Sequence, residues 1–185
     1  MDRGAEYYAR FLAGDDDAFA DLIREYKNPL MLFINGIVGN IYTAEDLTED
    51  TFVRIAVRKP RFREGKASFK TWLFTIARNV TYTAIRKRQR IQEVQEDVAA
   101  MKADTRSIEE EYLRKEEYIE LHDAMDSLPP DYRQVLYLIF FEEMSCDDVA
   151  RTMKKRSAQV SGLLRRAKEA LKQILTEKGI SREGL

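Results

Sequence analysis

The sequence is poor in residues that build disulfides, metal sites and turns: its 185 residues include one cysteine, one histidine, four prolines and eight glycines. A single cysteine, Cys146, excludes a disulfide within the chain and is typical of a reducing cytoplasm. Neither Cys146 nor His122 belongs to a Cys/His pattern with the spacing of a metal site, and Asp15 to Asp17 lack the spacing of a calcium loop. We therefore expect no metal and no cofactor.

Long apolar segments are also missing. Runs such as Leu30 to Ile34 are far too short to span a bilayer, and the N-terminus lacks the charged start and apolar block of a signal peptide. No segment alternates between polar and apolar residues for long enough to predict a sheet. With helix formers throughout and 34% charged residues, the sequence predicts a cytoplasmic all-α protein of one domain or two small ones.

The formal net charge of −1 conceals a strong segregation of charge along the chain. Residues 1–50 carry 11 acidic and 4 basic side chains, whereas residues 54–90 carry 12 basic and one acidic. Residues 91–120 are acidic again, with 10 acidic and 4 basic, and residues 151–172 hold 8 basic and one acidic. Phosphate neutralisation needs clustered cations whatever the total, so two cationic blocks predict two nucleic-acid contacts on one molecule.

The segment from Lys66 to Arg90 has the apolar period of a helix. Its expected buried stripe consists of Phe69, Trp72, Leu73, Ile76 and Val80. The expected opposite side mixes rings, aliphatics and charge: Phe74, Arg78, Tyr82 and Ile85. Exposed rings beside cations favour a surface that holds nucleic acid with unstacked bases. From these residues alone, an ordinary amphipathic helix with a solvated basic tail explains the pattern equally well.

The first 40 residues predict three helices. The first covers residues 5–12 and ends before Gly14. The second follows Asp15 to Asp17, whose carboxylates suit the first turn of a helix. Pro29 fits the first turn of a third helix, which Gly39-Asn40 ends.

A capping box at Thr43 to Asp46 predicts a helix over residues 44–57. One of its surfaces is polar and consists of Asp46, Glu49, Asp50 and Arg54. This surface is either a solvated face or a docking site for a basic partner protein. Lys59-Pro60 ends the helix, and the basic loop of residues 61–68 is well placed to catch an extruded base.

The C-terminal part begins after a polar, acidic linker over residues 91–106. Helices are predicted near residues 108–128 and at 131–141, followed by a second capping box at Ser145 to Asp148. A tight basic turn then leads to a helix over residues 158–175, with an expected stripe of Val160, Leu164, Ala167, Leu171 and Ile174. A short helix, a tight turn and a longer basic helix are the layout of a helix-turn-helix DNA reader.

Four blocks of sequence, in this order, resemble a known family. They are AEDLTEDTF (44–52), FKTWLFTIARN (69–79), LPPDYRQVL (128–136) and the helix-turn-helix from Ser145. The chain thereby resembles the extracytoplasmic-function (ECF) group of bacterial sigma factors over residues 15–175.

The resemblance implies a promoter-specificity subunit of RNA polymerase, which is not an enzyme. It implies a sigma region 2-like helical domain (1–90), an acidic linker (91–117), a sigma region 4-like helix-turn-helix domain (118–178) and a tail (179–185). The implied partners are core RNA polymerase and promoter DNA, single-stranded at the −10 element and duplex at the −35 element. An inhibitory anti-sigma factor is implied by analogy alone.

The resemblance also implies roles for individual residues. The polymerase would be bound by Asp46, Leu47, Glu49, Asp50, Phe52 and Arg54. The −10 element would be recognised and opened by the 61–68 loop and α-helical residues after it, namely Arg61, Arg63, Lys66, Lys70, Trp72, Arg78, Asn79, Arg86 and Arg88. The −35 element would be read by Lys155, Arg156, Ser157, Gln159, Ser161, Arg165, Arg166 and Lys168.

The second helix of the helix-turn-helix departs from the family pattern. Here it reads QVSGLLRRAKE, whereas family members usually read like TVKSRLHRARE. Ser161, Gly162 and Leu163 thus stand where Lys or Arg, Ser and Arg are typical. We therefore expect weak reading of the usual −35 sequence, with phosphate contacts carrying more of the binding.

Two other classes of function compete with this one. A conventional helix-turn-helix repressor or activator would bind duplex DNA without polymerase, which leaves residues 66–90 and the acidic 44–54 segment without an obvious role. A metal-dependent nuclease would use Asp46, Glu49 and Asp50, but a single histidine and the surface spacing of these carboxylates argue against it.

Overall fold

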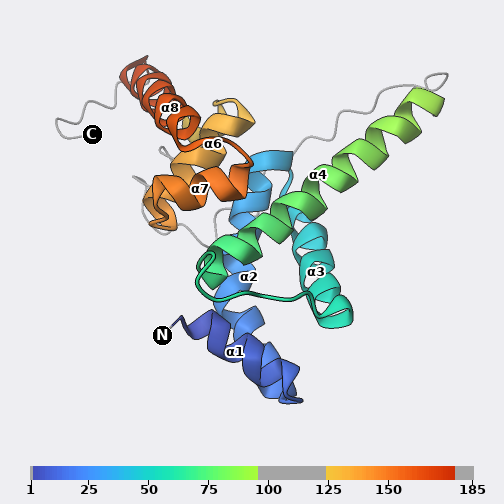
Figure 1. The fold of residues 1–185 in the computed structure, drawn as a ribbon. Coiled ribbons are helices and arrows are strands. Elements are labelled where there is room, and N and C mark those ends of the chain that lie inside the picture. The colour runs from blue at the N-terminus through green and yellow to red at the C-terminus, as the bar shows by residue number, and fades with distance from the viewer. Residues whose placement is uncertain (1, 96–123, 178–185) are drawn as a thin grey trace. The chain divides into compact units, whose positions relative to one another are not determined.

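The computed structural model describes residues 2–95 and 124–177, and every regular element in these ranges is a helix (Figure 1). The chain divides into two compact units, Met1–Thr105 and Arg106–Leu185. These findings confirm the all-α prediction. Most of the predicted linker, and His122, lie outside the described residues. Within the described part, no helix combines the length and the apolar character needed to cross a bilayer.

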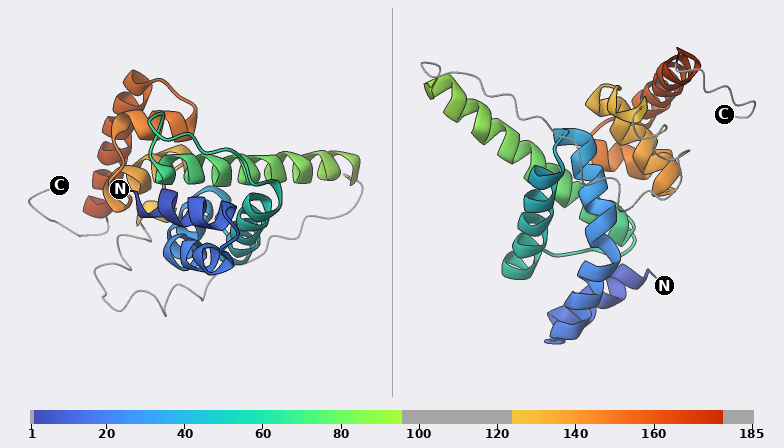
Figure 2. Two further views of the ribbon diagram at one scale, coloured as in Figure 1. Left: turned by 60° about the horizontal axis from the view of Figure 1, so that its bottom comes forward. Right: turned by 180° about the vertical axis from the view of Figure 1, so that it is seen from behind.

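The first unit is a bundle of four helices: α1 (Arg3–Leu12), α2 (Asp16–Val38), α3 (Ile41–Arg58) and α4 (Phe69–Gln95). Helix α2 packs against the other three, and α3 and α1 each also contact α4. The last turns of α4 extend beyond its neighbours, as both views in Figure 2 show, and residues 86–91 there are exposed. The core contains Tyr8, Leu22, Leu30, Phe33, Ile34, Ile55, Phe69, Leu73 and Phe74, each almost fully buried.

Helix α2 runs unbroken through Pro29, so the prediction of two separate helices here was wrong. A proline inside a helix lacks one backbone donor and costs about 3 kcal/mol. Its neighbours offset this cost, because Leu22, Tyr26, Leu30 and Phe33 form one continuous buried stripe on both sides of it. Gly39, in the left-handed conformation (φ 67°), ends the helix as the sequence predicted.

Helix α3 begins three residues before the predicted start. Asn40, not Thr43, is the N-cap: its side-chain oxygen accepts a hydrogen bond from the Thr43 backbone N–H at 2.8 Å. Asparagine is at least as good a cap as threonine, so the helix starts one turn earlier with an equally effective cap. The helix ends at Arg58, and Lys59 follows in the left-handed region with φ 43°.

The second unit contains α6 (Pro130–Leu136), a π-helical turn η2 (Tyr137–Phe141), α7 (Cys146–Met153) and α8 (Ser157–Glu177). Helix α8 contacts both α6 and α7. Its buried stripe is Val160, Leu163, Ala167, Leu171 and Leu175, so the sequence placed two of these five positions one residue off.

The predicted single helix over residues 131–141 changes form halfway. After Leu136 the backbone widens, and the Glu142 N–H donates to the Tyr137 carbonyl five residues earlier, at 3.2 Å. This turn stacks the rings of Tyr137 and Phe141, with centroids 5.4 Å apart, and leaves Phe140 49% exposed. The apolar period of the sequence does not show where such a turn is inserted.

Candidate functional site

The predicted docking residues on α3 divide between the surface and the core. Asp46, Glu49 and Asp50 are exposed, and Arg54 is half-buried. The other two, Leu47 and Phe52, are 6% and 5% exposed and pack inside the bundle. Only the four charged residues are therefore available for direct contact with a partner.

Next to these carboxylates, α3 and α4 enclose a groove of about 400 Å³. Its floor is apolar, and on the α3 side Val53 and Val57 remain 58% and 77% exposed. Asp50, Arg54, Arg58 and Lys87 also line the groove. The sequence did not reveal this surface, because a valine on a helix face usually indicates burial, whereas Val53 and Val57 stay exposed beside α4.

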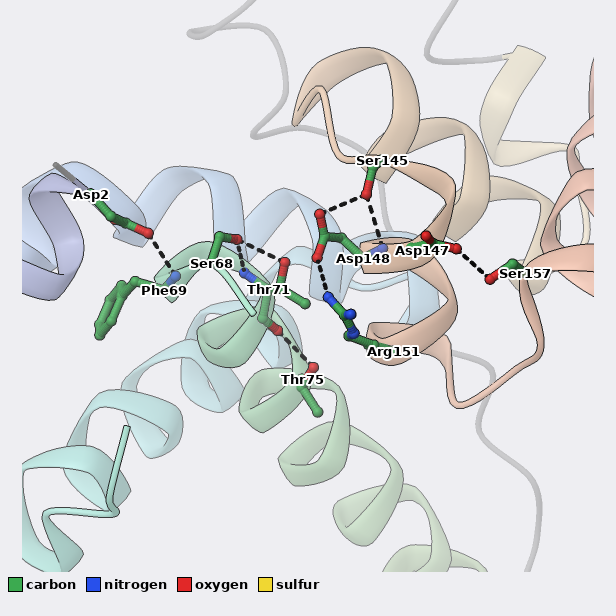
Figure 3. A network of polar contacts seen from close by, with 10 residues as sticks. All are labelled: Asp2, Ser68, Phe69, Thr71, Thr75, Ser145, Asp147, Asp148, Arg151 and Ser157. Atoms are coloured by element: carbon green, nitrogen blue, oxygen red, sulfur yellow. Dashed lines mark hydrogen bonds and ion pairs between the residues drawn. The ribbon is translucent and has the colours of Figure 1, made fainter. Parts of the chain in front are cut away.

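The 61–68 loop ends at Ser68, which is the N-cap of α4. The Thr71 backbone N–H donates to Ser68 Oγ at 3.1 Å, so Ser68 caps α4 (Figure 3). The Ser68 and Thr71 hydroxyls also lie 2.8 Å apart. Gly65 adopts φ 82°, a backbone conformation that glycine adopts readily at the tip of a loop. Arg61, Arg63 and Lys66 are all exposed on this loop.

Trp72 lies at the base of the loop in a cluster of four aromatic rings. Its ring centroid is 5.1 Å from those of Tyr8 and Phe69 and 5.5 Å from that of Phe62. Such distances are those of favourable aromatic pairs. Trp72 and Phe62 nevertheless remain half-buried, so the cluster presents ring surface beside the loop cations.

The basic residues of α4 follow this cluster along the helix. Lys70, Arg78 and Asn79 are half-buried, whereas Arg86 and Arg88 are exposed. The Arg78 guanidinium lies over the Tyr82 ring, 4.4 Å from its centroid. Phe74, expected on this outer side, is instead fully buried against Phe33, with ring centroids 5.2 Å apart. The outer surface is thus narrower than predicted, because α2 covers one edge of it.

Helices α7 and α8 form the predicted helix-turn-helix. Ser145 caps α7 by accepting the Asp148 N–H at 3.2 Å, and its hydroxyl donates to Asp148 Oδ2 at 2.7 Å (Figure 3). Lys154 ends α7 in the left-handed conformation with φ 54°. At the start of α8, the Ser157 hydroxyl donates to Asp147 Oδ1 at 2.5 Å, which ties the two helices together across the turn.

The predicted −35 residues occupy different environments. Arg156, Gln159, Ser161, Arg165 and Arg166 are exposed along the turn and α8. Three of the predicted residues already have side-chain partners, and Ser157 with its bond to Asp147 is the first of them. Lys155 Nζ lies 3.0 Å from Asp131 Oδ2, and Lys168 Nζ lies 4.8 Å from the centroid of the Phe140 ring.

Two residues near the N-terminus belong to the same neighbourhood as the 61–68 loop, although the sequence did not single them out. Asp2 accepts a hydrogen bond from the Phe69 backbone N–H, and the Tyr8 hydroxyl donates to the Pro60 carbonyl. An aspartate before a helix indicates an N-cap, but no local pattern reveals a partner so far along the chain. Burial raises the pKa of Tyr8 from its ordinary 10.0 to about 12, so this hydroxyl remains protonated at neutral pH.

Comparison with known proteins matches both units to one family. Residues 22–91 match Sigma-70 region 2, and residues 118–171 match Sigma-70, region 4. The chain is 31% identical over 176 residues to the ECF RNA polymerase sigma factor BldN of Streptomyces coelicolor, covering 95% of this chain and 67% of that protein. The chain belongs to the ECF RNA polymerase sigma factors. It is also 28% identical over 173 residues to the sigma factor SigW of Bacillus subtilis, covering 89% of this chain and 92% of SigW.

A solved structure agrees with this membership. The sigma factor RpoE of Bartonella quintana, determined in complex with the anti-sigma factor NepR, is 25% identical to this ECF sigma factor with a TM-score of 0.70. The match covers 85% of this chain and 96% of that one. The protein is therefore a promoter-directing transcription initiation factor and not an enzyme, and a polymerase-independent regulator is not favoured. Within the described ranges, no group of three or more His, Cys, Asp or Glu side chains is placed to hold a metal ion.

Proposed function

We propose that this sigma factor divides promoter opening among three surfaces. The exposed carboxylates of α3 bind core RNA polymerase, the 61–68 loop and α4 take up the −10 element, and the turn and α8 contact the −35 element. The observation that carries this proposal is the half-buried Trp72, whose ring packs against the loop residue Phe62 between exposed Arg61 and Arg63. Rings with cations are the combination that binds separated strands.

The energetics of strand opening suit such a site. Extruding a base costs a few kcal/mol, and stacking on an aromatic side chain returns about 1–3 kcal/mol per base. Arg61, Arg63 and Lys66 add attraction to the phosphates, which is strongest at low salt. Binding energy of this kind opens a few base pairs without nucleotide hydrolysis, provided that the polymerase holds the protein in place.

We expect the −35 element to be bound mainly through its phosphates, unlike the −10 element. Arg156, Arg165 and Arg166 are exposed on or next to α8, where they reach phosphates, whereas Ser161 is a short side chain beside Gly162. Phosphate contacts position a protein on DNA but carry no sequence information directly. The second unit therefore anchors the holoenzyme on duplex DNA, and the first unit supplies most of the base selection.

We also propose that an anti-sigma protein regulates this factor in the cytoplasm, where the polymerase acts. The relative RpoE was solved with such a partner. In this chain the apolar groove beside Asp50, with exposed Val53 and Val57, offers a surface for an apolar helix of that partner. Occupation of the groove would block the neighbouring α3 carboxylates and keep the factor from the polymerase.

Transcription with purified core polymerase tests the assignment of surfaces. The template is a pool of duplex promoters in which the −35 and −10 positions are randomised, and the start sites are read by sequencing the transcripts. We expect transcripts to start at discrete sites, with a strong base preference at the −10 positions and a weak base preference at the −35 positions. A strong preference at −35 and none at −10 would contradict the division proposed for the two units.

A further inference from the structure

Helix α1 contacts the chain at both ends of the 61–68 loop. At the end where α4 begins, Asp2 Oδ2 accepts the Phe69 N–H at 2.6 Å (Figure 3). The other oxygen of the same carboxylate accepts the Gly4 and Ala5 N–H groups at 3.1 and 3.4 Å. One carboxylate thus caps α1 and α4 together, which fixes the angle and distance between the two helix starts.

Tyr8 holds the other end of the loop. Its hydroxyl donates to the Pro60 carbonyl at 2.7 Å, and its side chain is only 1% exposed. The same ring lies against both rings at the start of α4, with centroid distances of 5.1 Å to Trp72 and 5.7 Å to Phe69. Tyr8 therefore connects the entry of the loop to the aromatic cluster at its exit.

The approach of α1 to α4 depends on a glycine. A Cβ at Gly4 would lie 2.4 Å from Cδ1 of Phe69 and 2.7 Å from the Tyr26 hydroxyl oxygen. Any larger residue would push α1 away from Phe69, which is itself fully buried. We call Asp2, Gly4 and Tyr8 the α1 clamp.

We propose that the α1 clamp is a positioning element for promoter opening: it fixes both ends of the 61–68 loop so that the loop is already held against the Trp72 ring cluster before DNA arrives. This inference rests on the proposed role of the loop at the −10 element. Helix α1 lies outside residues 22–91, the part of the chain that matches Sigma-70 region 2. A site whose loop is already ordered spends less binding energy on ordering it and discriminates more sharply between bases.

The structure offers matched variants for a test. Tyr8→Phe removes the bond to Pro60 and keeps the ring. Tyr7→Phe removes a hydroxyl at the neighbouring position, where it accepts a hydrogen bond from Arg3 Nη2 at 3.2 Å. Asp2→Ala removes a cap that also holds α4. Asp15→Ala removes the cap of α2, whose side chain accepts the Ala18 N–H, and an ion pair with Arg10 at the far end of α1, without touching the loop.

Two measurements on the full-length protein report whether the loop and the Trp72 cluster are held in place. Trp72 is the only tryptophan, so quenching of its fluorescence by acrylamide reports the order of the cluster. Selection from the randomised promoter pool by holoenzyme reports discrimination at −10. We expect Tyr8→Phe and Asp2→Ala to increase quenching and to reduce the preference for the best −10 base over its competitors by about three- to tenfold. Tyr7→Phe and Asp15→Ala should change neither.

The outcomes separate this inference from the proposed function. If Trp72→Phe alters −10 selection while Tyr8→Phe and Asp2→Ala leave it unchanged, the clamp is not a positioning element and the proposed function stands. Equal losses in the clamp variants and their controls would also overturn it, because they would reflect stability alone. If wild-type holoenzyme shows no −10 preference at all, the proposed function fails first.

Discussion

Lys155 Nζ lies 3.0 Å from Asp131 Oδ2, so one of the cations predicted to contact the −35 element already has an acidic partner. A lysine that is paired with a carboxylate must break that ion pair, or share its charge, before it can neutralise a phosphate. Arg166 is exposed on α8 next to Arg165, and no carboxylate of the described residues forms an ion pair with it. This difference gives a quantitative prediction for duplex binding.

Arg166→Ala is expected to lower the slope of log affinity against log salt by about one, because one phosphate contact is lost. Lys155→Ala should lower it by less. Asp131→Ala frees Lys155 and should strengthen binding, which serves as the control. The measurement is a salt titration of holoenzyme on duplex promoter DNA. Equal effects of the Arg166 and Lys155 variants would show that the ion pair has no influence on the contact.

Charge reversal on α3 tests the polymerase-docking surface. Asp46→Lys and Asp50→Lys are expected to weaken binding to core polymerase at least tenfold, since opposite charge at a complementary interface becomes repulsion. Both side chains are exposed, so the fold should be unaffected. Asp17→Lys reverses an equally exposed carboxylate on α2 and is the control. Unchanged affinity in the α3 variants would place the docking surface elsewhere.

Replacement of Trp72 and Asn79 tests strand opening. Trp72→Ala and Asn79→Ala should abolish open complexes and leave polymerase binding intact. Because Trp72 packs against three rings, its truncation also removes about 3–5 kcal/mol of packing. Trp72→Phe preserves much of that packing and is the better test. Open complexes are measured by reactivity of unpaired −10 bases, with thermal unfolding as the control. Lost polymerase binding would contradict the assignment.

The raised pKa of Tyr8 predicts an alkaline weakness in the first unit. In the unfolded chain this phenol ionises near its ordinary pKa of 10.0, whereas in the fold it stays protonated to about 12. The free energy of unfolding therefore falls between these two values, by up to about 1.4 kcal/mol per pH unit. Tyr8→Phe should show a shallower decline than wild type, and Tyr7→Phe should not. Urea unfolding between about pH 9 and 12, followed by Trp72 fluorescence, measures this decline in the free energy of unfolding.

Gly162→Ala is expected to stabilise the second unit by about 0.5–1 kcal/mol, because glycine inside a helix costs backbone entropy. The added Cβ would meet Arg166 Nη1 at 3.8 Å, an ordinary contact. Thermal unfolding of this sigma factor followed by circular dichroism measures the gain. A loss of stability would mean that α8 does not remain helical through this position.

The periodic patterns were enough to predict the helices but not their ends or their packing. Ser145 was predicted as a cap because a capping box is local, whereas Asn40 was missed because Thr43 offers an equally good local signal. Pro29 was assigned to a helix start because tertiary packing across it is not visible in the sequence.

The candidate site was predictable only where it depends on residues near one another in the chain. Trp72 and the cations of the 61–68 loop lie close together in the sequence and remain neighbours in the fold. Leu47 and Phe52 were assigned to the docking surface by resemblance, but the structure buries them. Asp2 and Tyr8 reach the loop from more than fifty residues away, and such contacts follow from the assembled bundle rather than from any motif.

We propose above that the ring cluster and the cations of the first unit let core RNA polymerase open DNA at defined promoters. The most direct measurement is start-site mapping on the randomised promoter pool with core polymerase alone, with added wild-type protein and with Trp72→Phe. We expect discrete starts that require the protein, share a −10 sequence and weaken in the variant. Association with polymerase without initiation at any defined site would contradict it.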